Sequence, residues 1–153
     1  SRFKLPPRMA LLVPGGALHR PAKRWPLERY AELASALVAR GLVPVILGGT
    51  SETLLAQAIL SHSPEAVDLT GKTSLLELAS LARRAVVAIG NDTGPMHLIT
   101  AAGCPSIVLF SRESDPALCA PRGRRVTVLR RASLEELAVE EVLAALAEAA
   151  GGP

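Results

Sequence analysis

The chain alternates short apolar runs with longer amphipathic segments. The apolar runs predict strands at residues 9–13, 43–47, 66–69, 85–89, 106–110 and 125–129. Runs rich in Val, Ile and Leu are typical of parallel strands that are buried on both faces. Because helices are expected between them, the pattern predicts an α/β fold with a doubly wound, Rossmann-like parallel sheet and right-handed crossovers.

Start and stop signals place the intervening helices. Residues 27–39 have apolar positions at helical spacing, with Pro26 before them and Gly41 after them, and a second helix is expected at residues 51–60.

Two later helices are expected from capping boxes, in which a serine is followed three residues on by a glutamate. Ser74 with Glu77 and Ser133 with Glu136 match this pattern. The helices are therefore expected to begin directly after each serine, and the second is expected to run over residues 134–149.

Residues 85–98 are the most informative stretch, because an apolar run breaks into a short polar turn and restarts as a helix. Asp92 or Thr93 can cap this helix, and Pro95 stands where a first-turn proline is tolerated. Unpaired first-turn N–H groups and the helix dipole suit a phosphate, which Gly94 lets approach closely. The turn must lie at the carboxyl end of its strand, where ligands of open α/β sheets bind.

The same turn has a simpler interpretation. Asp92 can be a cap and nothing more, and His97 can be an ordinary packed residue of the first helical turn. The local pattern alone leaves both interpretations open.

The turn after the first strand contains Gly15 and Gly16, followed by Lys23 and Arg24. The glycines permit close approach of the backbone to a ligand, and a lysine is a compact cation for phosphate. Alternatively, both cations are solvated surface residues.

Two further turns carry candidate chemistry. Glu52 opens the second helix, where a carboxylate can accept hydrogen bonds from ribose hydroxyls or simply complement the helix dipole. Gly71 and Lys72 look like the end of a phosphate-binding P-loop, but that loop requires glycine where Ala66 stands. The turn is therefore expected to form a pocket wall or to start a helix.

Composition narrows the classes of function. The 153 residues suit one domain, and the 3% aromatic content argues against a surface that stacks nucleic-acid bases. The net charge of +3 favours anionic partners, such as a nucleotide, an acidic glycolipid or an anionic membrane face.

The two cysteines, Cys104 and Cys119, form neither a zinc motif nor a disulfide framework, so the protein is expected in a reducing cytoplasm. Neither a metal ion nor a cofactor is expected. Because Ser1 is not Met, residues 1–8 are interpreted as a linker remnant of a longer protein.

Six short motifs, taken in order, resemble the lipopolysaccharide heptosyltransferase family, glycosyltransferase family 9. They are PAKRWP (21–26), GG (48–49), TGKTSL (70–75), NDTGPMHL (91–98), AAGCP (101–105) and SDP (114–116). The resemblance implies the carboxyl-terminal domain of a two-domain GT-B glycosyltransferase, with residues 9–150 forming the nucleotide-sugar-binding domain. The amino-terminal acceptor domain would be absent from this chain.

The resemblance implies transfer of heptose, or a related sugar, from ADP-heptose to the lipopolysaccharide core, without a metal ion. The resemblance also implies that six residues of this chain bind the donor substrate: Lys23, Glu52, Asp92, Thr93, Gly94 and His97. Gly15, Gly16, Gly71 and Lys72 are secondary candidates. The general base is expected in the missing half, with Asp92 the candidate within this chain, so the isolated domain is expected to be inactive. The chain departs from the family pattern at Gly15-Gly16-Ala17, where some members have hydroxyl residues, and at Ser111-Arg112-Glu113, where the family often has Gly-Pro-Thr.

Alternatives are a GT-B domain for another nucleotide-sugar and a non-catalytic nucleotide-binding module. Five arginines near the carboxyl end of the chain form either a solvated face or a surface for peripheral contact with the inner membrane. They are Arg122, Arg124, Arg125, Arg130 and Arg131. No nucleic-acid partner is expected.

Overall fold

The computed structural model describes residues 7–15, 25–111 and 126–149. Its strands are β1 (Met9–Val13), β2 (Val43–Ile46), β3 (Val67–Asp68), β4 (Val87–Asn91), β5 (Ser106–Ser111) and β6 (Val126–Arg131). Its α-helices are α1 (Leu27–Ala39), α2 (Thr53–His62), α3 (Leu75–Arg84), α4 (Gly94–Ala101) and α6 (Val139–Ala149). Short 3₁₀ helices span Thr50–Glu52 and Leu134–Glu136.

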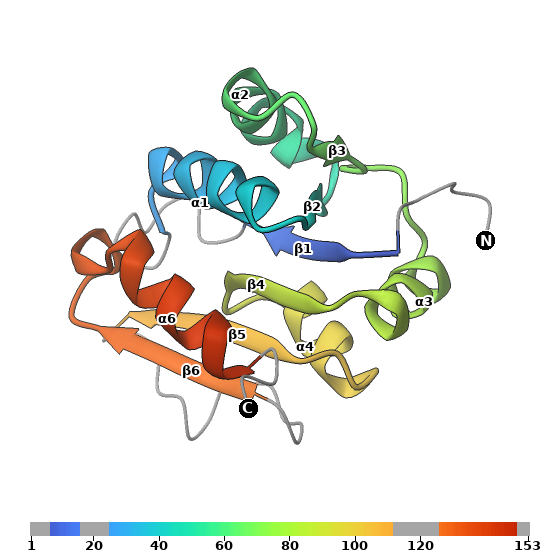
Figure 1. Cartoon of the computed structure of the whole chain (residues 1–153). Coiled ribbons are helices and arrows are strands. Elements are labelled where there is room, and N and C mark those ends of the chain that lie inside the picture. The colour runs from blue at the N-terminus through green and yellow to red at the C-terminus, as the bar shows by residue number, and fades with distance from the viewer. Residues whose placement is uncertain (1–6, 16–24, 112–125, 150–153) are drawn as a thin grey trace.

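The strands form one sheet in the order β3-β2-β1-β4-β5-β6, and every neighbouring pair is parallel. This is the Rossmann order, so the predicted doubly wound fold is confirmed. Strand order reverses between β1 and β4, which lie side by side at the centre of the sheet (Figure 1). The crevice beyond the carboxyl ends of these two strands is where such a fold binds a ligand.

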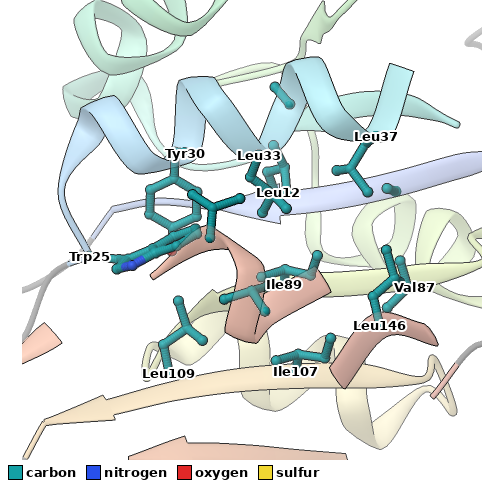
Figure 2. Packing of buried hydrophobic residues seen from close by; sticks show 14 of the residues in the cluster. Leu12, Trp25, Tyr30, Leu33, Leu37, Val87, Ile89, Ile107, Leu109 and Leu146 are labelled. Atoms are coloured by element: carbon teal, nitrogen blue, oxygen red, sulfur yellow. The ribbon is translucent and has the colours of Figure 1, made fainter. Parts of the chain in front are cut away.

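Hydrophobic clusters cover both faces of the sheet. On one face, residues of α1, α2 and α6 pack against the strands, and Figure 2 shows Trp25 and Tyr30 at the start of α1 within this cluster. On the other face, α3 and α4 contribute Leu78, Leu81 and Met96. In the described part of the chain, no helix is both long and apolar enough to cross a membrane.

The central strand β4 was misplaced by two residues in the sequence prediction, which ended it at residue 89. Gly90 and Asn91 are strand residues, because Gly90 pairs with Val13 of β1 and Asn91 pairs with Leu109 of β5. A Cβ atom at Gly90 would lie 2.7 Å from the Cβ of Val13. The glycine therefore permits the close approach of β1 and β4 rather than marking the turn.

The prediction of one helix from residue 134 to residue 149 was also wrong. A 3₁₀ turn ends at Glu136, and α6 begins only at Val139. The carbonyl of Leu137 accepts hydrogen bonds from Trp25 Nε1 at 2.8 Å and from Arg29 Nη1 at 2.6 Å. Because this carbonyl is bound to α1, it is not available to continue the helix. The capping box at Ser74 and Glu77, by contrast, is confirmed.

Candidate functional site

A pocket of about 140 Å³ opens at the carboxyl ends of the central strands. Its lining residues come from the turn after β1, the turn after β2 and the start of α4: Val13, Gly15, Gly48, Glu52, Thr93 and Pro95. Three of the predicted site residues, Gly15, Glu52 and Thr93, are thus brought together from segments far apart in the sequence.

The side chain of Glu52 occupies the space that two glycines leave open. A Cβ atom at Gly15 would lie 2.6 Å from Glu52 Cγ, and one at Gly48 would lie 3.0 Å from Glu52 Oε1. The carboxylate also accepts a hydrogen bond from the Gly49 amide at 2.9 Å and one from the Ser51 hydroxyl. The Glu52 carboxylate is therefore held at the pocket wall, with oxygen lone pairs beyond those two bonds.

The start of α4 forms the opposite wall. Thr93 is the N-cap, and its Oγ1 accepts from the Met96 amide at 3.4 Å. Gly94 is the exposed first residue of the helix, and a Cβ atom there would have no neighbour within 4 Å. Open space therefore lies beside Gly94 at the start of the helix.

Asp92 does not cap α4, which removes the interpretation of this residue as a cap only. Its Oδ1 lies 3.1 Å from Nε2 of His97, one turn into the helix. The Asp92 side chain is 14% exposed and that of His97 is 45% exposed, so His97 is not a packed core residue. The pair presents a carboxylate and an imidazole beside the helix start.

Gly71 and Lys72 lie at the outer side of the same edge, after β3. The Gly71 amide donates to the Gly48 carbonyl at 2.8 Å, and Gly71 has a φ of +71°. A Cβ atom at Gly71 would lie 2.7 Å from Thr50 Cγ2. Nζ of Lys72 lies 3.3 Å from the Asp68 carbonyl, and Lys72 does not line the pocket. The turn therefore supports the pocket wall from outside.

Sequence reasoning assigned no role to Asn91, whose side chain lies directly behind the pocket. This residue is 2% exposed and makes hydrogen bonds to the turn after β1 and to the start of α1. The sequence does show a polar residue, Asn91, at the end of an otherwise apolar strand, which could have marked it as a candidate. The neighbouring residues do not indicate which distant groups its side chain binds.

Several predicted residues fall outside the described ranges, namely Gly16, Lys23, Cys119, Arg122, Arg124 and Arg125. Of the two remaining arginines, Arg130 is exposed, whereas Arg131 forms an ion pair with Glu141. Within the ranges that the structure covers, no three His, Cys, Asp or Glu side chains gather as a metal site would require.

The parallel sheet in Rossmann order, with a pocket at its topological switch point, defines the chain as a Rossmann-like α/β protein. The model for glycosyltransferase family 9 (heptosyltransferase) matches residues 2–146, and the chain belongs to this family. Both the predicted family and the predicted fold class are thereby confirmed.

Individual relatives agree with this assignment. Lipooligosaccharide heptosyltransferase 2 of Haemophilus influenzae is 33% identical over 120 residues, which is 75% of this chain and 34% of that protein. The chain thus spans about a third of the length of this curated relative.

Two solved structures share the fold. The structure of E. coli ADP-heptose lps heptosyltransferase II matches with a TM-score of 0.85 and 28% identity, over 94% of this chain and 46% of that one. The structure of E. coli heptosyltransferase WaaC with ADP matches with a TM-score of 0.83 and 26% identity, over 93% and 44%.

Proposed function

We propose that this chain is the donor-binding half of a heptosyltransferase and that its central pocket binds ADP-heptose. The observation that carries the proposal is the pocket between Gly15, Glu52 and Thr93, at the switch point of a family 9 fold. A structural neighbour determined with ADP supports a nucleotide diphosphate as the ligand.

In this proposal, each wall of the pocket binds a different part of the donor substrate. The start of α4 holds the diphosphate, because the Thr93 and Gly94 amides and the helix dipole favour an anion and Gly94 leaves space for it. Glu52 accepts hydrogen bonds from the ribose hydroxyls. Asp92 faces the sugar rather than the phosphates, because a carboxylate next to phosphate oxygens would be repelled.

His97 completes this arrangement. Its Nε2 lies 3.1 Å from Asp92 Oδ1, which orients the imidazole beside the helix start and leaves Nδ1 for contact with the donor substrate. Gly15 and Gly71 allow the surrounding turns to pack closely, and Lys23 adds a cation to the phosphates.

The reaction is transfer of heptose to a hydroxyl of the lipopolysaccharide core. As the bond to the sugar breaks, negative charge grows on the leaving diphosphate, so donors at α4 and Lys23 stabilise the transition state more than the ground state. The acceptor and the general base belong to an amino-terminal domain outside residues 9–150. The protein works in the cytoplasm, at the inner face of the membrane that carries its acceptor.

Titration calorimetry tests the proposal. The chain should bind ADP and ADP-heptose in the presence of EDTA, more tightly than UDP or GDP, and should transfer no sugar alone. Preference for UDP or GDP would identify a donor domain of another specificity, and absence of nucleotide binding would indicate a non-catalytic module. Binding that disappears in EDTA would contradict the metal-free mechanism.

Lys23→Ala tests the phosphate side of the proposal. Loss of one charge-assisted hydrogen bond should weaken ADP binding by about 1.5–3 kcal/mol. Adenosine, which has no phosphate, should bind the variant as it binds the unaltered chain. Equal weakening of both ligands would place Lys23 away from the phosphates.

A further inference from the structure

Through its side chain, Asn91 joins the turn after β1, which forms one wall of the pocket, to the start of α1. It is the last residue of β4 and is 2% exposed. Nδ2 donates to the carbonyls of Pro14 at 3.0 Å and Gly15 at 3.1 Å. Oδ1 accepts from the Trp25 amide at 3.3 Å and from the Tyr30 hydroxyl at 2.9 Å. All four hydrogen-bonding positions of the amide are therefore used.

The orientation of this amide is fixed by its partners. A backbone N–H, such as that of Trp25, can only donate, and the carbonyls of Pro14 and Gly15 can only accept. Rotating the amide by 180° would place oxygen against two carbonyl oxygens. Trp25 and Tyr30 pack edge to face with ring centroids 4.9 Å apart, which holds the start of α1 in place (Figure 2).

The Gly15 carbonyl belongs to the turn that forms the pocket wall next to Glu52. Space there is tight, since even a Cβ atom at Gly15 would lie 2.6 Å from Glu52 Cγ. The backbone of Asn91 leads directly into Asp92 and Thr93 on the opposite wall. One residue thus sets the separation between the turn after β1 and the start of α4.

We propose that Asn91 is a positioning residue for nucleoside diphosphate binding, which rests on the function proposed above. Its Nδ2 hydrogens hold the Pro14–Gly15 turn at the distance from the start of α4 that the ligand requires. Asn91 makes no contact with the ligand itself, because its side-chain amide is fully engaged within the protein.

Two substitutions distinguish the role of Asn91 Nδ2 from that of Asn91 Oδ1. Both are made in the intact protein expressed from its complete gene. Asn91→Asp keeps the acceptor for Trp25 and Tyr30 but places a carboxylate oxygen against the carbonyls of Pro14 and Gly15. Tyr30→Phe removes one hydrogen bond at the Oδ1 end, keeps the ring that packs on Trp25, and leaves the bonds to the turn in place.

At pH 8, Asn91→Asp is expected to raise the Kd for ADP, and the KM for the nucleotide-sugar, by roughly tenfold or more. The KM for the acceptor should not change. Tyr30→Phe should lower the melting temperature while changing the Kd for ADP by less than about twofold, since the hydrogen bond that it removes from Asn91 Oδ1 is neutral and lies away from the turn. Equal effects of the two variants on ADP binding would overturn the positioning role.

A measurement on the unaltered protein covers the case in which Asn91→Asp does not fold. The side-chain NH₂ resonances of Asn91, assigned through contacts with the Tyr30 ring, should shift when ADP is added, together with the Gly15 amide. Unchanged Asn91 resonances at saturating ADP would overturn the proposal. Failure of the unaltered protein to bind ADP would overturn the proposed function and this inference together, whereas normal ADP binding by Asn91→Asp would overturn this inference alone.

Discussion

Helices α3 and α4 follow the carboxyl ends of the parallel strands β3 and β4, respectively, and pack in the same hydrophobic cluster. Their first turns differ. In α3, Ser74 Oγ accepts from the Glu77 amide at 3.1 Å, and Glu77 Oε1 accepts from the Ser74 amide at 2.9 Å. This helix therefore places its own carboxylate against its N-cap amide.

Helix α4 is capped by the Thr93 hydroxyl, with no glutamate returning to the cap. Its first residue is Gly94, beside open space, where α3 has the exposed Leu75. The comparison teaches that α3 carries its own carboxylate at its N-cap, whereas α4 carries none, which makes the start of α4 the better position for an external anion. The sequence around each serine or threonine does not by itself reveal that difference in surroundings.

The largest expected effect comes from giving α4 the first residue of α3. Gly94→Leu should fold normally, because the helix start has room for a side chain and a helical φ suits any residue. The side chain would occupy the space proposed for phosphate and weaken ADP binding about 100-fold, which is about 2.8 kcal/mol. Calorimetry and thermal melting of the same sample measure both effects.

The matched control is Leu75→Gly in α3. It should cost at most about 1 kcal/mol of stability, from lower helix propensity, and leave the Kd for ADP unchanged. If Gly94→Leu bound ADP normally, the two helix starts would be equivalent and the proposed phosphate position would be wrong.

A second test compares two aspartates near the ends of the preceding strands, Asp68 as the last residue of β3 and Asp92 directly after β4. Asp68 Oδ1 accepts from the amide and the hydroxyl of Thr70, so its hydrogen bonds are local, whereas Asp92 faces His97. Asp92→Asn should leave stability and ADP binding nearly unchanged, but should weaken ADP-heptose binding roughly tenfold, because a carboxylate accepts stronger hydrogen bonds than an amide. Asp68→Asn should not alter affinity for either ligand.

Thermal melting and competition between ADP and ADP-heptose decide this case. Asp92→Asn with unchanged affinity for ADP-heptose would remove the sugar-side role. Parallel loss of stability and of affinity for both ligands would assign Asp92 a structural role instead.

The sequence predicted the strands and their order well because buried parallel strands and right-handed crossovers depend on local patterns and general rules. It predicted β1 (Met9–Val13) at its observed bounds. It missed the end of β4 at Asn91 and the break between Leu134 and Val139, both of which depend on partners elsewhere in the chain. Asn91 contacts residues 61 to 77 positions away, and Leu137 is bound by Trp25 from 112 positions away.

For the candidate site, the sequence identified the residue types but not their geometry. It left Asp92 and Thr93 as alternative caps, since either residue type can cap a helix. The structure assigns the cap to Thr93 and pairs Asp92 with His97. The position of Glu52 between Gly15 and Gly48 also depends on packing of β1 against β2, which no single turn encodes.

A smaller effect is expected from removing the caps. Ser74→Ala should lower the free energy of unfolding by about 1 kcal/mol, as loss of a serine cap usually does, without changing the Kd for ADP. Thr93→Ala should cost about the same in stability and also weaken ADP binding, because Thr93 lines the pocket. Chemical denaturation gives the stabilities, and equal ADP affinities in both variants would contradict the distinction between the helix starts.

The smallest effect concerns α6, whose first turn also holds a carboxylate, as in α3. Hydrogen bonds from the Ala138 amide, at 2.9 Å, and from Arg131 lower the pKa of Glu141 below its ordinary value. A carboxyl whose pKa is lowered by folding stabilises the fold above its unfolded pKa of about 4.5, and this contribution disappears as pH falls through the lower folded value. Because Glu141 is 39% exposed, Glu141→Gln should lower the free energy of unfolding by only about 0.5 kcal/mol at pH 7.

Denaturant unfolding at pH 7 and at pH 3 should show that the difference in stability between the variant and the unaltered protein shrinks in acid. ADP binding at pH 7 should be unaffected. A stability difference that persists at pH 3 would mean that the carboxylate charge is not its cause.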